Sequence, residues 1–108
     1  MSTMEMTETN TKTRVLIQPN LELEPPKNYK IIYVNDEITT VEFVIESLIT
    51  IFDYSSTVAE DISKQIHEKG SAAVAVLPYE LAEQKGVEVT VLARNNGFPL
   101  QVRLEQAD

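Results

Sequence analysis

The stretch Tyr33–Val44, YVNDEITTVEFV, joins a β-like run to the strongest helical pattern in this chain of 108 residues. Upstream, Tyr29–Val34 (YKIIYV) is β-branched and aromatic, which is typical of a half-buried strand. Downstream, apolar residues recur at three- and four-residue steps over residues 40–53, the period of an amphipathic helix. The polar residues 35–39 therefore form a strand-to-helix corner, a kind of loop that often presents binding groups.

The same corner has a purely structural explanation. Thr39 and Glu42 have the spacing of a capping box, in which the Thr side chain accepts from one free helix N–H and the Glu side chain accepts from another. Asn35 and Asp36 would then form an Asx turn ahead of the helix. The structural and the binding explanations are compatible, so both remain open at this point.

Four further elements follow this corner. Thr57 and Glu60 repeat the capping-box spacing, Gly70 is a typical helix stop, and Gly86 weakens the pattern of the last helix. No repeat and no Gly-rich phosphate loop is present. The sequence predicts an α+β fold, a three-stranded antiparallel sheet packed against three helices in the order β-α-α-β-α-β. The elements after the corner are a helix over 57–69, a strand over 71–77 stopped by Pro78, a helix over 79–94 and an edge strand over 100–105.

Residues 1–26 are rich in Thr, Met, Glu and Asn, and they end in Pro25-Pro26, which disfavours helix on its N-terminal side. We expect a flexible N-terminal extension over 1–26 and a single folded domain over 27–108. The start of the chain has no basic segment followed by an apolar one, so a secretory signal is not indicated. The expected location is the bacterial cytoplasm, with an organelle stroma as the less favoured alternative.

Composition excludes several classes of function. The chain has no Cys and a single His, which argues against disulfides, thiolate chemistry and an all-protein zinc site, and no cofactor is indicated. No stretch approaches the ~20 apolar residues of a membrane span. The formal charge of -8 would repel nucleic acid and anionic membranes, so a cationic or amine-bearing partner is expected.

From about Pro25 to Ala107 the chain resembles ClpS, the small adaptor that delivers N-degron substrates to a Clp unfoldase and protease. The resemblance lies in several short motifs that occur in the family's order and at its spacing. These are Pro25-Pro26 with Tyr29-Lys30, Val34-Asn35-Asp36-Glu37 with Thr39 and Glu42-Phe43-Val44, His67 with Gly70, Glu80-Leu81-Ala82-Glu83 with Lys85, and Pro99-Leu100 with Leu104-Glu105.

The resemblance implies recognition of a free α-amino terminus that carries a bulky hydrophobic first side chain, with no catalytic residue. A terminal ammonium has three N–H donors, and the family's three acceptor positions are occupied here by Asn35, Asp36 and His67. The imidazole must be neutral to accept a hydrogen bond. The pocket positions implied for the first side chain are Ile38, Thr39, Val41, Val44, Ser63, Ile66 and Leu100.

The resemblance also implies the partner. Glu80 and Lys85 match positions that dock onto the N-terminal domain of a Clp AAA+ unfoldase of the ClpA or ClpC type, and the family suggests a monomer. The chain departs from the common pattern at three pocket positions. Many members have Pro and Met where this chain has Thr40 and Val41, and an apolar residue, often Met, in place of Ser63. We therefore expect altered selectivity among first residues.

Two other interpretations stay open from the sequence. The first is an acidic protein–protein docking domain of ribosomal-stalk-like build, which would not need Asn35, Asp36 and His67 together. The second is a small hydrolase or acid–base enzyme that uses Asp36 and His67. No nucleophile elbow, Cys or second His supports this enzyme.

Overall fold

The computed structural model describes residues 27–107, and the proposed N-terminal extension, residues 1–26, lies outside them. The described residues form six elements in the predicted order. They are β1 (Asn28–Val34), α1 (Val41–Phe52), α2 (Ser56–Lys69), β2 (Ser71–Pro78), α3 (Tyr79–Asn95) and β3 (Gln101–Gln106). None of the helices in this part of the chain is long and apolar enough to cross a membrane.

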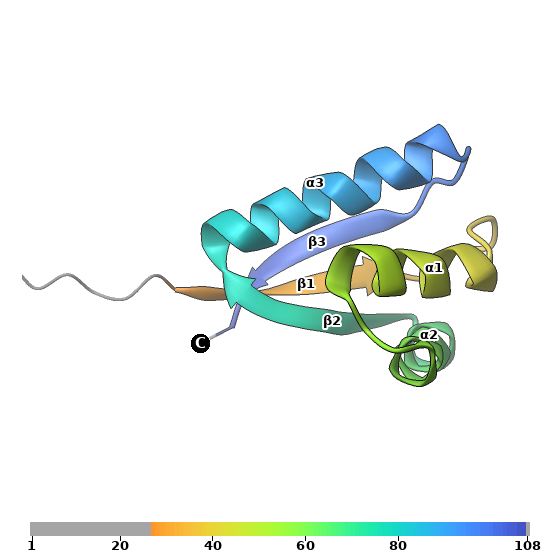
Figure 1. Ribbon diagram of the computed structural model, residues 1–108, viewed down its shortest axis with the longest axis horizontal. Coiled ribbons are helices and arrows are strands. Elements are labelled where there is room, and N and C mark those ends of the chain that lie inside the picture. Colours follow the sequence, from red (N-terminus) through yellow and green to blue (C-terminus); the bar gives the residue numbers. More distant parts are fainter. Residues whose placement is uncertain (1–26, 108) are drawn as a thin grey trace, which may run out of the picture.

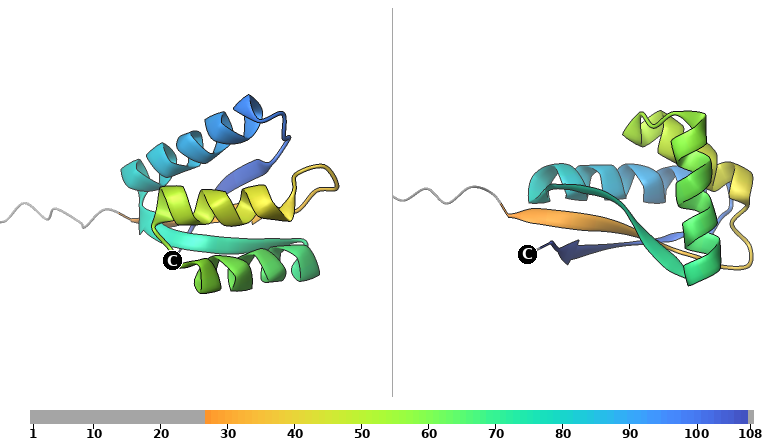
Figure 2. Two further views of the ribbon diagram at one scale, coloured as in Figure 1. Left: turned by 45° about the vertical axis from the view of Figure 1, so that its right-hand side comes forward. Right: turned by 90° about the horizontal axis from the view of Figure 1, so that it is seen from below.

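The sheet has the order β2-β1-β3, and β1 pairs antiparallel with both neighbours. α1 and α3 lie on one side of the sheet, and α2 runs beside β2 at the edge of the sheet (Figures 1 and 2). The alternation along the strands matches this arrangement, since Ile31 and Tyr33 are fully buried in the core while Arg103 and Glu105 are exposed. The predicted α+β fold with a three-stranded antiparallel sheet is confirmed.

A bulge in β2 sets the register at the end of the sheet that matters for the site. Ile31 pairs with Ala75 and Ile32 with Ala73, so Val74 has no partner opposite it. The Val74 carbonyl accepts a hydrogen bond from the Tyr54 hydroxyl instead. Past the bulge the ladder continues to the last residue of β1, where Val34 pairs with Ser71.

Both predicted capping boxes are wrong in position. The N-cap of α1 is Thr40, whose hydroxyl accepts from the Phe43 N–H at 3.1 Å, because the hydroxyl of Thr39 is already committed to Asp36. The N-cap of α2 is Ser55, whose hydroxyl accepts from the Val58 N–H. In each case another hydroxyl residue stood close to the predicted one, and local spacing alone could not choose between them. The predicted stop of α2 at Gly70 is confirmed, with a φ of 85°.

The last helix, α3, continues unbroken through Gly86 despite its weak helical pattern. Gly86 is buried against β3, where an added Cβ would lie 3.7 Å from Cγ1 of Val102 and 3.9 Å from Cδ2 of Leu104. Packing on the sheet therefore stabilises a helix that propensity alone disfavours.

One polar contact lies inside the core. Tyr33 and Ser47 are both fully buried, and their hydroxyl oxygens are 2.8 Å apart. The Ser47 hydroxyl donates to the Val44 carbonyl at 2.8 Å, so Tyr33 is the donor to Ser47. Burial raises the pKa of Tyr33 well above its usual range, which keeps its hydroxyl protonated as this hydrogen bond requires.

Candidate functional site

The pairing of β1 with β2 brings two distant parts of the sequence together. Because Val34 pairs with Ser71, Asn35 lies beside the turn that ends α2, and its N–H donates to the Gly70 carbonyl at 2.9 Å. His67 is in the last turn of α2, just before this glycine. The corner after β1 and the end of α2 are therefore neighbours.

A hollow of about 510 Å³ lies at this junction, within the usual range for a ligand site. We call it the β1–α1 hollow. It contains all three residues expected to bind an amine. Its walls are formed by Asn35, Asp36, Glu37, Ile38, Thr39, Thr40, Val41, Glu42 and His67.

Asp36 organises the corner through three hydrogen bonds. Its Oδ1 accepts from the N–H groups of Ile38 at 2.8 Å and Thr39 at 2.6 Å, and its Oδ2 accepts from the Thr39 hydroxyl at 2.8 Å. Partial desolvation, the largest single influence, raises the pKa of Asp36. The three hydrogen bonds and the nearby charge of Arg94 outweigh it and hold the pKa below its ordinary value. The hollow thus contains a fixed negative charge.

The side chains of Asn35 and His67 differ from that of Asp36, because they are not held by hydrogen bonds to other described residues. Both residues are exposed, and within residues 27–107 neither side chain makes a hydrogen bond. The carboxylate of Asp36 bonds to Ile38 and Thr39 and not to His67. The Asp–His pair needed by the hydrolase interpretation is therefore not formed.

The structure divides the expected pocket residues into two groups. Ile38, Thr39 and Val41 line the β1–α1 hollow, and the first and last of these are large apolar side chains left 63% and 50% exposed. The other four, Val44, Ser63, Ile66 and Leu100, are buried and do not line the hollow. Three of these four, Val44, Ile66 and Leu100, belong to the core cluster.

Other residues of the site had no assigned contact with the ligand. Glu37, Thr40 and Glu42 also line the hollow, Thr40 having been expected only to alter selectivity, and their place in the same corner was a usable signal. Arg94 had no such signal, because it acts from the last turn of α3. Its Nη1 donates to the carbonyls of Phe98 at 3.0 Å and Leu100 at 2.9 Å, and so fixes the turn that leads into β3.

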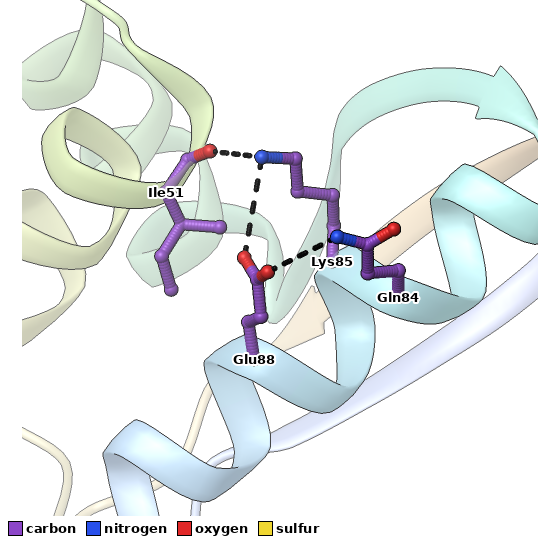
Figure 3. Close-up of polar contacts among 4 residues, drawn as sticks. All are labelled: Ile51, Gln84, Lys85 and Glu88. Atoms are coloured by element: carbon purple, nitrogen blue, oxygen red, sulfur yellow. Dashed lines mark hydrogen bonds and ion pairs between the residues drawn. The ribbon is translucent and has the colours of Figure 1, made fainter.

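The two expected docking residues lie near the start of α3 but line different hollows. Glu80 is exposed beside Lys27, Pro78 and Tyr79. Lys85 lines a hollow at the end of α1, where its Nζ donates to the Ile51 carbonyl at 2.9 Å and lies 4.0 Å from Glu88 (Figure 3). Lys85 therefore supplies a charged hydrogen-bond donor to one of the free carbonyls at the C-terminus of α1, whose last turn has no basic residue of its own.

A second hollow, of about 270 Å³, lies between α3 and β3 and is largely apolar. Its polar side chains are Thr90, whose hydroxyl is already bonded to the Gly86 carbonyl, and the single exposed carboxylate of Glu83, so it lacks a convergent set of polar groups. Within residues 27–107 no group of three His, Cys, Asp or Glu side chains could hold a metal ion. The β1–α1 hollow is the better candidate site because it combines free acceptors with exposed apolar side chains.

The sequence and the fold both match known adaptor proteins. Residues 24–103 match the family model "ATP-dependent Clp protease adaptor protein ClpS". The ClpS proteins of Nautilia profundicola and Shewanella denitrificans are 39% and 43% identical, over 87% and 80% of this chain and 97% and 84% of theirs. The structure of Agrobacterium tumefaciens ClpS2 bound to L-phenylalaninamide superposes with a TM-score of 0.74 at 36% identity, covering 76% of this chain and 99% of that one.

These matches extend over nearly the whole described domain and reach both parts of the site, the corner after β1 and the end of α2. They give no support to a ribosomal-stalk-like docking domain. The chain therefore belongs to the ClpS family of ATP-dependent Clp protease adaptors, and it is an adaptor rather than an enzyme.

Proposed function

We propose that this adaptor binds substrates through a free α-amino terminus with a bulky hydrophobic first residue, an N-degron, and delivers them to a Clp AAA+ unfoldase for degradation. The observation that carries the proposal is that Asn35, Asp36 and His67 line one hollow. In support, the similar Agrobacterium ClpS2 binds phenylalaninamide, which combines a free α-amine with a phenyl side chain.

The three polar residues suit an ammonium group. An ammonium has three N–H donors, and the Asn35 amide oxygen and a neutral His67 ring nitrogen are acceptors without an internal partner in the described chain. Asp36 uses its oxygens mainly to hold Thr39 and Ile38, and its contribution to a ligand is the opposing charge. Each charge-assisted hydrogen bond is worth roughly 1.5–3 kcal/mol.

The first side chain would enter beside the ammonium. Ile38 and Val41 are exposed at the edge of the hollow, and covering them with an apolar side chain removes both from water. A longer side chain would reach the buried positions Val44, Ser63, Ile66 and Leu100. Burying one Leu- or Phe-sized side chain contributes about 1.5–3 kcal/mol. After association costs, we expect a micromolar affinity, a binding free energy of about 8 kcal/mol in magnitude, which suits an adaptor that must release its cargo.

Three positions would alter selectivity. Val41 is shorter and stiffer than the Met common in the family, and Thr40 and Ser63 are also more polar than the residues that usually stand there. We expect an order of preference among first residues Leu, Phe, Tyr, Trp, Ile and Val that differs from that of a Met-containing relative. Equal ranking in the two proteins would exclude this part of the proposal.

The deciding experiment is fluorescence anisotropy with short labelled peptides that begin with Leu, Phe, Tyr, Trp, Ile, Val or Ala, each with a free and an acetylated amine. Binding is expected only for free-amine peptides with bulky first residues. His67→Ala should weaken binding about tenfold or more, because it removes one hydrogen bond to a charged group. Glu68→Gln, an exposed change beside it on α2, is the matched control. Equal binding of acetylated peptides would exclude amine recognition.

We further propose that Glu80 and Lys85 contact the N-terminal domain of a ClpA- or ClpC-type unfoldase and that the adaptor acts as a monomer. Glu80 is exposed, whereas Lys85 also stabilises α1 through the Ile51 carbonyl. Glu80→Lys is therefore the cleaner test, since a charge reversal there leaves the fold intact and should weaken binding to the isolated unfoldase domain. Glu105→Lys, an exposed reversal on β3, should leave that binding unchanged.

Residues 1–26 are proposed as the extension that the unfoldase engages during delivery. A chain that starts at Lys27 should bind N-degron peptides normally but fail to accelerate their degradation by the complete unfoldase and protease. Normal degradation by this shortened chain would contradict the proposed role of the extension.

A further inference from the structure

The described residues contain two buried serines, Ser47 and Ser63, which differ in whether their hydroxyls have hydrogen-bond partners. Ser47, fully buried, has the Tyr33 hydroxyl and the Val44 carbonyl as partners. Ser63, 5% exposed, has no hydrogen-bond partner for its hydroxyl within residues 27–107. A buried hydroxyl without a partner is unfavourable, so an unpaired one within a binding protein indicates a position for a ligand group.

The position of Ser63 relates it to the β1–α1 hollow. Ser63 precedes His67 by one turn on the same face of α2, which corresponds to about 6 Å along the helix. His67 is exposed and lines the hollow, whereas Ser63 and its neighbour Ile66 are buried. One turn of α2 therefore separates His67, the proposed ammonium acceptor in the open hollow, from Ser63, whose buried hydroxyl has no partner in the described residues. This spacing of about 6 Å along α2 is comparable with the length of a tyrosine side chain.

We propose that Ser63 is a specificity-determining residue that hydrogen-bonds the phenolic hydroxyl of a first tyrosine, so that the site prefers Tyr over Phe. This inference rests on the proposed N-degron function. The two side chains have the same ring and differ by one hydroxyl, which can donate to Ser63 Oγ or accept from it. With a first Phe, the Ser63 hydroxyl stays unpaired and is covered by the ring. A buried polar group that loses its partner discriminates against the ligand lacking it.

The competing explanation is that Ser63 is merely small and leaves room for large rings. In that case the added space would raise the affinities for a first Tyr and a first Phe equally. The ratio of their affinities separates a hydrogen bond from added space, because both rings fill the same volume. One net neutral hydrogen bond corresponds to about a three- to tenfold preference for Tyr.

The test measures binding of four peptides, identical except for a first Tyr, O-methyl-Tyr, Phe or acetylated Tyr, to the full chain and to its Ser63→Ala and Ser63→Thr variants. We expect Tyr to bind about three- to tenfold better than Phe in the original chain. In Ser63→Ala the ratio should fall to about one, chiefly through weaker binding of Tyr. Ser63→Thr, which keeps the hydroxyl, should restore the preference. O-methyl-Tyr should bind no better than Phe if the phenol is the donor, and a bond that Ser63 donates would leave it between the two.

The outcomes separate this inference from the proposed function. An unchanged ratio of Tyr to Phe in Ser63→Ala overturns the role of Ser63, while free-amine binding that acetylation abolishes would still support the N-degron function. If no free-amine peptide binds, both fall together.

A second measurement needs no ligand. If the Ser63 hydroxyl is unpaired, Ser63→Ala should leave the urea midpoint of unfolding unchanged or raise it, whereas Ser47→Ala should lower it. A clear fall in the midpoint for Ser63→Ala would show that the hydroxyl has a partner inside the protein, and the inference would be wrong.

Discussion

Two polar regions of the molecule are the contact between α1 and β1 around Ser47 and the β1–α1 hollow. Only in the first do all the polar side chains have hydrogen-bond partners within the described residues. In the contact, the Tyr33 hydroxyl donates to Ser47, which donates onward to the Val44 carbonyl, and all three groups are shielded from water. In the hollow, Asp36 is bonded to its own loop while the side chains of Asn35 and His67 have no partner within the described chain.

The difference shows how stability and recognition are divided in a small domain. Polar groups that hold the fold are paired inside the molecule, since an unpaired buried group opposes folding. In the β1–α1 hollow, the side chains of Asn35 and His67 have no partner within the described residues, and at this exposed site water satisfies them until a ligand does. Substitutions in the first region should therefore affect unfolding, and those in the second should affect binding.

The largest expected effect is on binding, from Asp36→Asn in the hollow. The change removes the charge opposite the ammonium, so the affinity for a free-amine peptide with a first Leu should fall about 10- to 100-fold. The measurement is fluorescence anisotropy, with Asp61→Asn as the matched control, because Asp61 is an exposed acid on α2 outside the hollow. Equal affinities of the two variants would remove Asp36 from amine recognition.

The next effect is on stability, from Ser47→Ala in the core. The variant leaves the Tyr33 hydroxyl buried without a partner, and the free energy of unfolding should fall by about 1–3 kcal/mol in urea titrations. Adding Tyr33→Phe removes the orphaned hydroxyl and should recover part of the loss. If the double variant were as unstable as the sum of the single ones, the two hydroxyls would not be acting as a pair.

Two glycines should respond in opposite directions by similar, smaller amounts. Gly86→Ala should stabilise the domain by up to ~1 kcal/mol, because the new Cβ makes ordinary contacts with Val102 and Leu104 and alanine favours helix. Gly70→Ala should destabilise it by about 1 kcal/mol, since the backbone there has a φ of 85° and holds Asn35 through its carbonyl. Thermal and urea unfolding of both variants would check the opposite signs.

The smallest expected effect concerns pH. The pKa of Asp36 is lower in the folded than in the unfolded state, so its ionised form stabilises the fold. This stability is present above the ordinary Asp pKa of ~3.9 and is lost as the pH falls through the lower folded value. The free energy of unfolding of Asp36→Asn should therefore depend less on pH below ~4 than that of the original chain. Parallel curves for the two proteins would contradict this assignment.

The sequence predicted the elements better than their ends. The strand at Tyr29–Val34 and the stop at Gly70 follow from local patterns, and both are confirmed. The caps were misplaced because Thr39 and Thr40 are equivalent by spacing, and the choice between them depends on the hydrogen bond from Thr39 to Asp36. That bond depends on the conformation of the corner and not on residue type.

The site was predictable to a similar extent. Asn35, Asp36 and Thr39 are neighbours in the sequence, so their common place in a polar corner could be inferred from the residues themselves. His67 is far away in the sequence, and its place in the site came from the family resemblance. The influence of Arg94 on Asp36 was missed, because nothing local connects the end of α3 to the end of β1.

By itself the sequence determined the order of strands and helices, the acidic charge and the chemistry available at the corner after β1, because these depend on residue type and short-range periodicity. Only the tertiary structure decided which polar groups have partners. The pairing of Val34 with Ser71 brings His67 to Asn35. The packing of α2 buries Ser63 with no partner among residues 27–107, while that of α1 gives one to Ser47. Hydrogen bonds between residues distant in sequence depend on three-dimensional packing, which local pattern does not encode.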